Sequence, residues 1–245
     1  MIGARLLAAQ TLTPTPGSIQ DASSPIAMPH QFSFEPEIQS GTQGTSNDGN
    51  PFAFQRGLQI RSWLHYDGVR DLTVTGAASY VYYFTVPGTS NYKHSEWRFT
   101  GLCNLRQRLA GGSLYEQLRF ELLNFRAANG AVQHLPRVRL RLGQNLSISE
   151  SRTKPYLGLY EEAITQYPQR CYSGVHFQGA RFFAGYGFDY KRRTSVLFGF
   201  KAGAEVSSSG STVTLFYGPV FSVTYNFFQG EVNERHRRTT AFKVF

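Results

Sequence analysis

Arginine residues at alternate positions are the feature of the sequence with the clearest chemistry. Arg137, Arg139 and Arg141 are separated by single apolar residues. In a β-strand, side chains two residues apart lie on the same face, about 6.8 Å from one another. Such a strand presents three guanidinium groups on one face and aliphatic side chains on the other. Guanidinium groups bind carboxylates and phosphates, so this spacing indicates internal ion pairs or an anion-binding surface.

Two earlier segments carry polar side chains with the same alternation. Their positions are Arg98, Arg106 and Arg108 in the first segment and Gln117, Arg119 and Glu121 in the second. If the three segments pair as neighbouring antiparallel strands, these side chains form one polar wall. We expect the wall to line the lumen of a barrel, where it is packed with charge pairs or forms a path for anions. A solvated face of a sheet is the third interpretation.

Residues with the spacing of an established catalytic or metal site are absent from the sequence. The six histidines are scattered without a His-x-x-x-His pair, and no Gly-x-Ser-x-Gly sequence occurs. Ser173 and His176 are the nearest candidates for a lipid hydrolase, but residues three apart point to opposite faces of a strand. We therefore predict a protein that is not an enzyme, with no catalytic residues, cofactor or metal.

Alternating segments that could position the polar wall begin at Phe52 and are separated by turn residues. They cover residues 58–66, 72–86, 96–109, 114–125, 137–142, 156–163, 171–183, 196–206, 213–228 and 239–245. Segments of this length and pattern are typical of transmembrane barrels. We predict an all-β fold, a single up-and-down antiparallel transmembrane β-barrel of about 10 strands, within a range of about 8 to 12.

The first 50 residues differ from the rest in composition. Residues 10 to 50 are rich in Thr, Pro, Ser, Gln and Gly, and five of the 11 prolines fall before residue 51. This composition predicts a flexible or partner-bound tail over residues 1–50 and a barrel over residues 51–245. Residues 1–9 resemble the end of an export signal, so we interpret them as the remnant of a signal peptide with a truncated or misassigned start.

The charge of the chain restricts its partners. The 245 residues include 25 Lys and Arg against 16 Asp and Glu, a net charge of +9. A basic surface at a membrane binds anionic lipids, so we expect outer-membrane lipids and lipopolysaccharide as partners. Arg235, Arg237 and Arg238 are the candidates for headgroup contacts. The tail is the candidate site for other membrane or periplasmic proteins, and nucleic acid is the less favoured partner.

Alternation alone cannot distinguish a membrane barrel from a soluble one, because it is symmetric to inversion. Three features favour the membrane: the apolar face continues from strand to strand, aromatic residues gather near strand ends, and the chain ends on Phe245. We therefore expect a barrel in the Gram-negative outer membrane with a structural, passage (porin-like) or partner-scaffolding role. The alternatives are a soluble β-rich nucleic-acid-binding protein and an outer-membrane lipid hydrolase.

Three segments resemble a bacterial family of predicted outer-membrane β-barrels of unknown function, domain of unknown function 2490. They are residues 114–121 (Leu-Tyr-Glu-Gln-Leu-Arg-Phe-Glu), the Arg-x-Arg-x-Arg segment at 137–141, and residues 154–161 (Lys-Pro-Tyr-Leu-Gly-Leu-Tyr-Glu). The similarity covers residues 56 to 228. One departure is Leu118, which separates Gln117 from Arg119 where the family commonly has the two adjacent. The resemblance implies fold and location and supplies no catalytic residues.

Overall fold

The computed structural model describes eleven stretches of the chain: residues 11–23, 26–27, 31–44, 50–69, 71–86, 95–126, 130–149, 154–166, 176–190, 194–206 and 212–225. These stretches contain β-strands joined by turns. The strands are β1 (Thr11–Ser23), β2 (Ile26–Ala27), β3 (Phe32–Gln43), β4 (Phe54–Val69), β5 (Leu72–Tyr83), β6 (Ser95–Leu109), β7 (Gly112–Arg126), β8 (Val132–Ser147), β9 (Tyr156–Gln166), β10 (His176–Tyr190), β11 (Thr194–Val206) and β12 (Thr212–Tyr225). Within the described stretches, no helix is long and apolar enough to cross a membrane.

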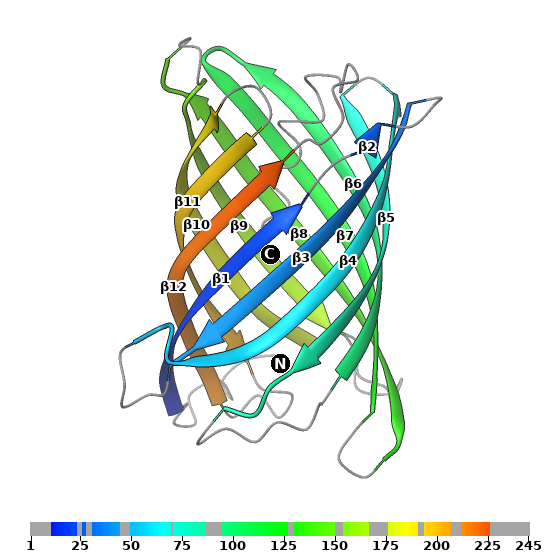
Figure 1. Cartoon of the computed structure of the whole chain (residues 1–245), viewed down its shortest axis with the longest axis vertical. Coiled ribbons are helices and arrows are strands. Elements are labelled where there is room, and N and C mark those ends of the chain that lie inside the picture. The colour runs from blue at the N-terminus through cyan, green and yellow to red at the C-terminus, as the bar shows by residue number, and fades with distance from the viewer. Residues whose placement is uncertain are drawn as a thin grey trace, which may run out of the picture.

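The strands form one closed barrel (Figure 1). From β3 to β12, each strand is antiparallel to the next. The first strand closes the ring, because β1 pairs with β3 in the antiparallel sense and with β12 in the parallel sense. The short β2 pairs with β3 in the same register as β1. It therefore continues the line of β1 along the same edge of β3. The result is a closed mixed barrel of 11 strands.

The closure differs from the sequence prediction in two respects. The all-β class and the single barrel are confirmed, but the count is 11 strands rather than about 10, and one strand pair is parallel. The difference arises in the expected tail, since β1 and β3 lie within residues 1–50. Proline rarely occurs inside sheets, yet β1 contains Pro14 and Pro16 and β3 contains Pro36. Residues 1–9 and the predicted last strand, 239–245, lie outside the described residues.

The two faces of the wall differ sharply in polarity. On β7, Phe120 faces outward and is 52% exposed, whereas the flanking Arg119 and Glu121 are buried. The guanidinium of Arg119 lies over the ring of Trp63 on β4, 5.8 Å from its centroid. Because β7 and β4 are not neighbours in the sheet, this contact crosses the barrel. The buried polar face is therefore the interior, and the apolar face is the outside.

An apolar cluster fills part of the interior. It consists of Tyr115, Tyr160, Phe183, Leu197 and Val220. Tyr115, Tyr160, Leu197 and Val220 lie toward the end of the barrel that carries the β4–β5, β6–β7, β8–β9 and β10–β11 connections, which we call the β6–β7 end, and Phe183 lies at the middle of its strand. The opposite end, with the β3–β4, β5–β6, β7–β8, β9–β10 and β11–β12 connections, is the β7–β8 end. The interior is therefore packed more densely toward the β6–β7 end.

A glycine makes room for the central ring of this cluster. The Phe183 ring stacks on Tyr160 with centroids 5.0 Å apart, and it occupies the space in front of Gly199. A Cβ atom at Gly199 would lie 2.4 Å from this ring and 2.8 Å from the carbonyl oxygen of Ala184. A side chain of any size at this position would displace the ring or the backbone.

We predict that Gly199→Ala destabilises the barrel by about 1–3 kcal/mol, the usual effect of overpacking a well-filled core. Thermal unfolding of the purified barrel, followed by circular dichroism, measures the effect. Gly101→Ala is the matched control, since Gly101 also lies mid-strand but faces outward with nothing within 4 Å of its Cβ position. Equal stability of both variants would contradict the proposed packing of Phe183.

Candidate functional site

Two buried carboxylates hold the arginines of the predicted polar wall. The first is Glu121 on β7, which lies opposite Arg137 on β8 in the antiparallel register. Its carboxylate accepts a hydrogen bond from Arg137 Nε at 2.6 Å and one from Arg139 Nη1 at 3.3 Å. Arg119, two residues away on the same face, approaches to 3.7 Å. One carboxylate therefore contacts three guanidinium groups.

The second carboxylate, Glu162 on β9, extends the network to two more strands. The register places it between Arg141 on β8 and Arg181 on β10. It accepts hydrogen bonds from Arg139 Nη2 at 2.6 Å and Arg141 Nη2 at 2.9 Å, and Arg181 lies 3.7 Å away. Arg139 thus bridges Glu121 and Glu162, and the ion-pair network continues from β7 to β10.

A second group of charged residues lies across the interior on β3 and β4. Glu37 pairs with Arg61 at 3.4 Å and accepts a hydrogen bond from the indole of Trp63. Glu35 lies 3.4 Å from His65. The Trp63 ring also joins the two groups, because Arg61 lies 4.7 Å from its centroid and Arg119 lies 5.8 Å away. A tryptophan ring near two guanidinium groups adds cation–π stabilisation to the ion pairs of both.

A third group occupies β10, β11 and β12. Arg181 donates to Glu205 at 2.5 Å. The guanidinium of Arg181 and the ammonium of Lys201 both lie 5.5 Å from the centroid of the Phe216 ring. Lys201 is buried, as are most of the other charged side chains of the interior.

The alternation predicted a polar wall, and most of the residues of that wall lie together inside the barrel. Gln117, Arg119, Glu121, Arg137, Arg139 and Arg141 are all buried on the interior face. Arg98 is largely buried and pairs with Glu96 at 2.7 Å. Arg106 is half-buried near the rim, 5.7 Å from the centroid of Tyr115, and Arg108 is exposed. Arg108 shares the inward parity, but it lies one residue before the end of β6, beyond the packed interior.

Several interior residues were missed by the sequence analysis. They are Glu35, Glu37, Arg61, Trp63, His65, Glu96, Glu162, Arg181, Lys201 and Glu205. Some signal was present, since Arg61, Trp63 and His65 alternate, as do Glu35 and Glu37. Glu161 and Glu162 are adjacent in sequence, and only the register shows that Glu162 is the inward one.

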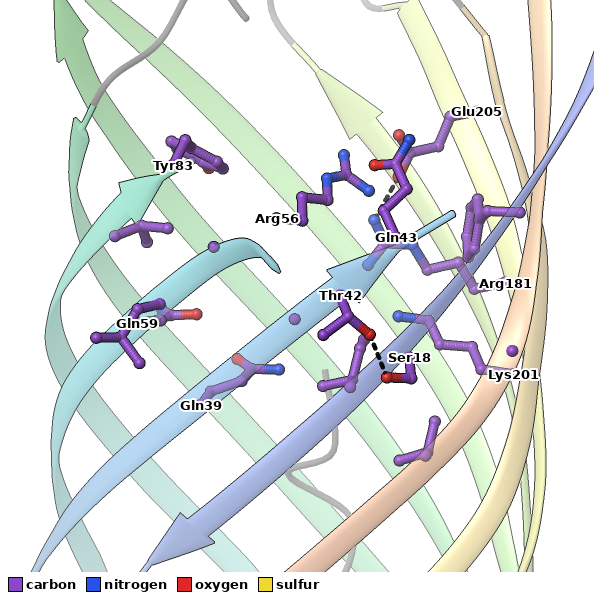
Figure 2. A pocket seen from close by; sticks show the side chains of 18 of the residues that line it. Ser18, Gln39, Thr42, Gln43, Arg56, Gln59, Tyr83, Arg181, Lys201 and Glu205 are labelled. Atoms are coloured by element: carbon purple, nitrogen blue, oxygen red, sulfur yellow. Dashed lines mark hydrogen bonds and ion pairs between the residues drawn. The ribbon is translucent and has the colours of Figure 1, made fainter. Parts of the chain in front are cut away.

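A cavity opens beside this network (Figure 2). Its volume is about 430 Å³, and ten of the strands contribute to its wall. Residues at strand termini, such as Gln43, Arg56 and Tyr83, form its outer part, so the cavity opens at the β7–β8 end. Arg61, Arg139 and Lys201 form its inner part, and Val220 of the apolar cluster also lines it.

Other candidate sites from the sequence lie partly outside the described residues. Arg235, Arg237 and Arg238 belong to this group, as does Ser173. His176 is described only as part of the backbone of β10. Within the described part of the chain, no three His, Cys, Asp or Glu side chains are grouped in a way that could hold a metal ion.

Comparison of the whole chain with models of known protein families gave no match, and comparison with curated proteins gave none either.

We predict that Glu162→Gln destabilises the barrel by about 3–5 kcal/mol, because three arginines then lose a shared buried carboxylate. The adjacent Glu161 points to the outside of the same strand, so Glu161→Gln is the matched control and should leave stability nearly unchanged. Chemical unfolding of both variants measures the difference. Similar values for the two would show that the network does not support the fold.

Proposed function

We propose that this chain is an integral β-barrel of the Gram-negative outer membrane, with a structural or partner-scaffolding role. The proposal includes an Arg-rich interior that is closed by its own side chains and performs no catalysis. The observation that carries it is the polarity of the wall. The network of charged side chains lies inside the barrel, and large apolar side chains cover most of the outside, where Glu161 is a charged exception.

The outer surface supports insertion in a lipid bilayer. Exposed large apolar side chains occur on all strands from β3 to β12, and they include Ile60, Trp97, Phe120, Leu140 and Phe200, each more than half exposed. A soluble monomer rarely exposes an apolar patch larger than a few hundred Å², whereas a membrane barrel requires an apolar band. The strands from β3 to β12 are 11 to 16 residues long, and spanning a bilayer takes about 9–11.

Aromatic pairs lie near both ends of the barrel. At the β6–β7 end, Phe32 and Tyr66 contact each other with ring centroids 5.0 Å apart. At the β7–β8 end, Tyr82 and Phe84 contact each other at 5.1 Å. Aromatic side chains favour the two interfaces of a bilayer, where one edge of the ring is apolar and the other is hydrated. This placement supports a membrane-spanning orientation along the barrel axis.

The packed interior favours a structural role over open passage. Arg119, Arg139 and Glu162 are each only 2–3% exposed, although they lie about midway along their strands. A barrel of this size has little free cross-section once long side chains fill it. Burial of the arginines also makes the alternative of a soluble nucleic-acid binder less favoured, because such a protein needs its cations on the outside.

Insertion can be tested by placing a charge on the outer face at two depths. Leu140→Arg, near the middle of the apolar band, should weaken folding into lipid vesicles by about 2–4 kcal/mol. Leu109→Arg, at the last residue of β6, should weaken it by about 0–1 kcal/mol, since arginine is tolerated near the interface. The extent of heat-resistant folding in urea titrations measures both. An equal effect at the two positions would contradict insertion along this axis.

The closed interior predicts an electrical result. Reconstituted in planar bilayers, the barrel should give no stepwise conductance, because the packed side chains leave no continuous aqueous path. A porin inserted under the same conditions provides the positive control. Regular anion-selective steps from this chain would instead support passage through the arginine-lined lumen.

A further inference from the structure

The cavity at the β7–β8 end has more cationic than anionic groups in its wall. Six arginines line it: Arg56, Arg61, Arg98, Arg137, Arg139 and Arg181. Lys201 adds a seventh cation, and among the described residues of the lining the carboxylates are Glu96 and Glu205. Each of these two carboxylates is already paired, with Arg98 at 2.7 Å and with Arg181 at 2.5 Å.

The carboxylates behind the cavity wall do not remove this excess. Glu121 and Glu162 are each shared among several arginines, as described above. One negative charge is therefore divided among several positive charges. Arg181 and Lys201 also lie near the neutral ring of Phe216. Like charges this close together in a poorly hydrated interior repel one another strongly. An anion that entered the cavity would relieve the repulsion.

Arg61 has unused donors at the wall of the cavity. Its side chain is 5% exposed, and its Nε and Nη1 atoms have no hydrogen-bond partner in the structure. The nearest carboxylate oxygen, on Glu37, lies 3.4 Å from Nη1. A buried guanidinium donor without an acceptor is costly. Each of the two atoms exposes less than 1 Å², so Arg61 contributes positive charge behind the cavity surface rather than a direct contact with a ligand.

The size and shape of the cavity restrict the ligand. A volume of about 430 Å³ is within the range of small-molecule sites. Cations from β4, β6, β8, β10 and β11 line it, so donors come from several strands. Figure 2 shows three of them, Arg56, Arg181 and Lys201, at its wall. Phosphate groups accept from several directions at once, and arginine forks match their oxygens. The exposed Arg56 at the mouth would attract such an anion electrostatically.

We propose that this cavity binds a compact phosphate compound with two or more negative charges. The site is a blind cavity rather than a path, because the apolar cluster lies beyond its inner end. The inference does not depend on the proposed membrane location. The phosphate could belong to a soluble compound or to a lipid headgroup, and both sources present the same chemistry to the cavity.

Calorimetric titration of the full chain in a non-ionic detergent, with inorganic pyrophosphate as the probe, tests the proposal. We expect saturable binding at one site that weakens as NaCl rises from about 0.1 M to about 1 M, where the screening length falls from about 10 Å to about 3 Å. Lys201→Met should weaken binding by roughly tenfold or more, because it removes a buried cation from the wall. Absence of saturable binding by the folded wild-type chain would overturn the proposal.

Two further variants keep the test decisive if Lys201→Met does not fold. Arg56→Gln changes an exposed mouth residue and should weaken pyrophosphate binding a few-fold. Arg108→Gln removes the same charge at the opposite end and should leave the affinity unchanged. If binding to the Arg56→Gln variant equals that of wild type, or if Arg108→Gln weakens binding as much as Arg56→Gln does, the cavity is not the site.

Competition identifies the source of the phosphate. Micelles doped with phosphatidic acid, compared with undoped micelles, are added to the pyrophosphate titration. Displacement of pyrophosphate supports the site with a lipid headgroup as its ligand. Retention of full pyrophosphate affinity supports the site with a soluble phosphate compound as its ligand.

Discussion

The structure depends on the sharing of Glu121 and Glu162 among the arginines of β7, β8 and β10. Removing charges from water costs several kcal/mol per ion, and only close pairing with full hydrogen bonding offsets that cost. The pairing exists in one register alone, in which Glu121 lies opposite Arg137 and Glu162 lies opposite Arg141. A slip of one residue would turn every charge of a strand to the apolar outside. The ion pairs therefore specify the register of the wall as well as its stability.

The two ends of the interior differ, although aromatic rings and cations meet in both, as Arg141 does with Tyr160 and Arg181 with Phe216. Tyr160 and Phe183 stack toward the β6–β7 end, where glycines on the wall leave space for the rings. Toward the β7–β8 end the lining is cationic and leaves a cavity. The described residues thus pack an apolar cluster toward one end of the barrel, while the other end holds charge that is only partly offset. The packed end supports the proposal of a closed barrel, and the cationic end supports the proposed anion site.

The sequence predicted the polar wall better than it predicted the partners of that wall. Alternation placed Arg119, Glu121 and Arg139 on one face, and the structure brings them together. It could not select Glu162 over Glu161, because that choice depends on a register between strands that lie far apart in the chain. The contact of Trp63 with Arg119 crosses the barrel and has no local signal. The strands β1 and β3 were missed because their prolines and polar residues resemble a linker.

What the sequence by itself determined was which residues share a face, since the period of two in a β-strand follows from backbone geometry. It did not determine which face points inward, because an alternating pattern reads the same when inverted. Only closure of the sheet decided that, by burying one face completely. Closure also set the strand count and the parallel β1–β12 pair, which depend on where the two edges of the sheet meet. The cationic cavity follows from that same closure, because it brings together cations from strands that are not neighbours.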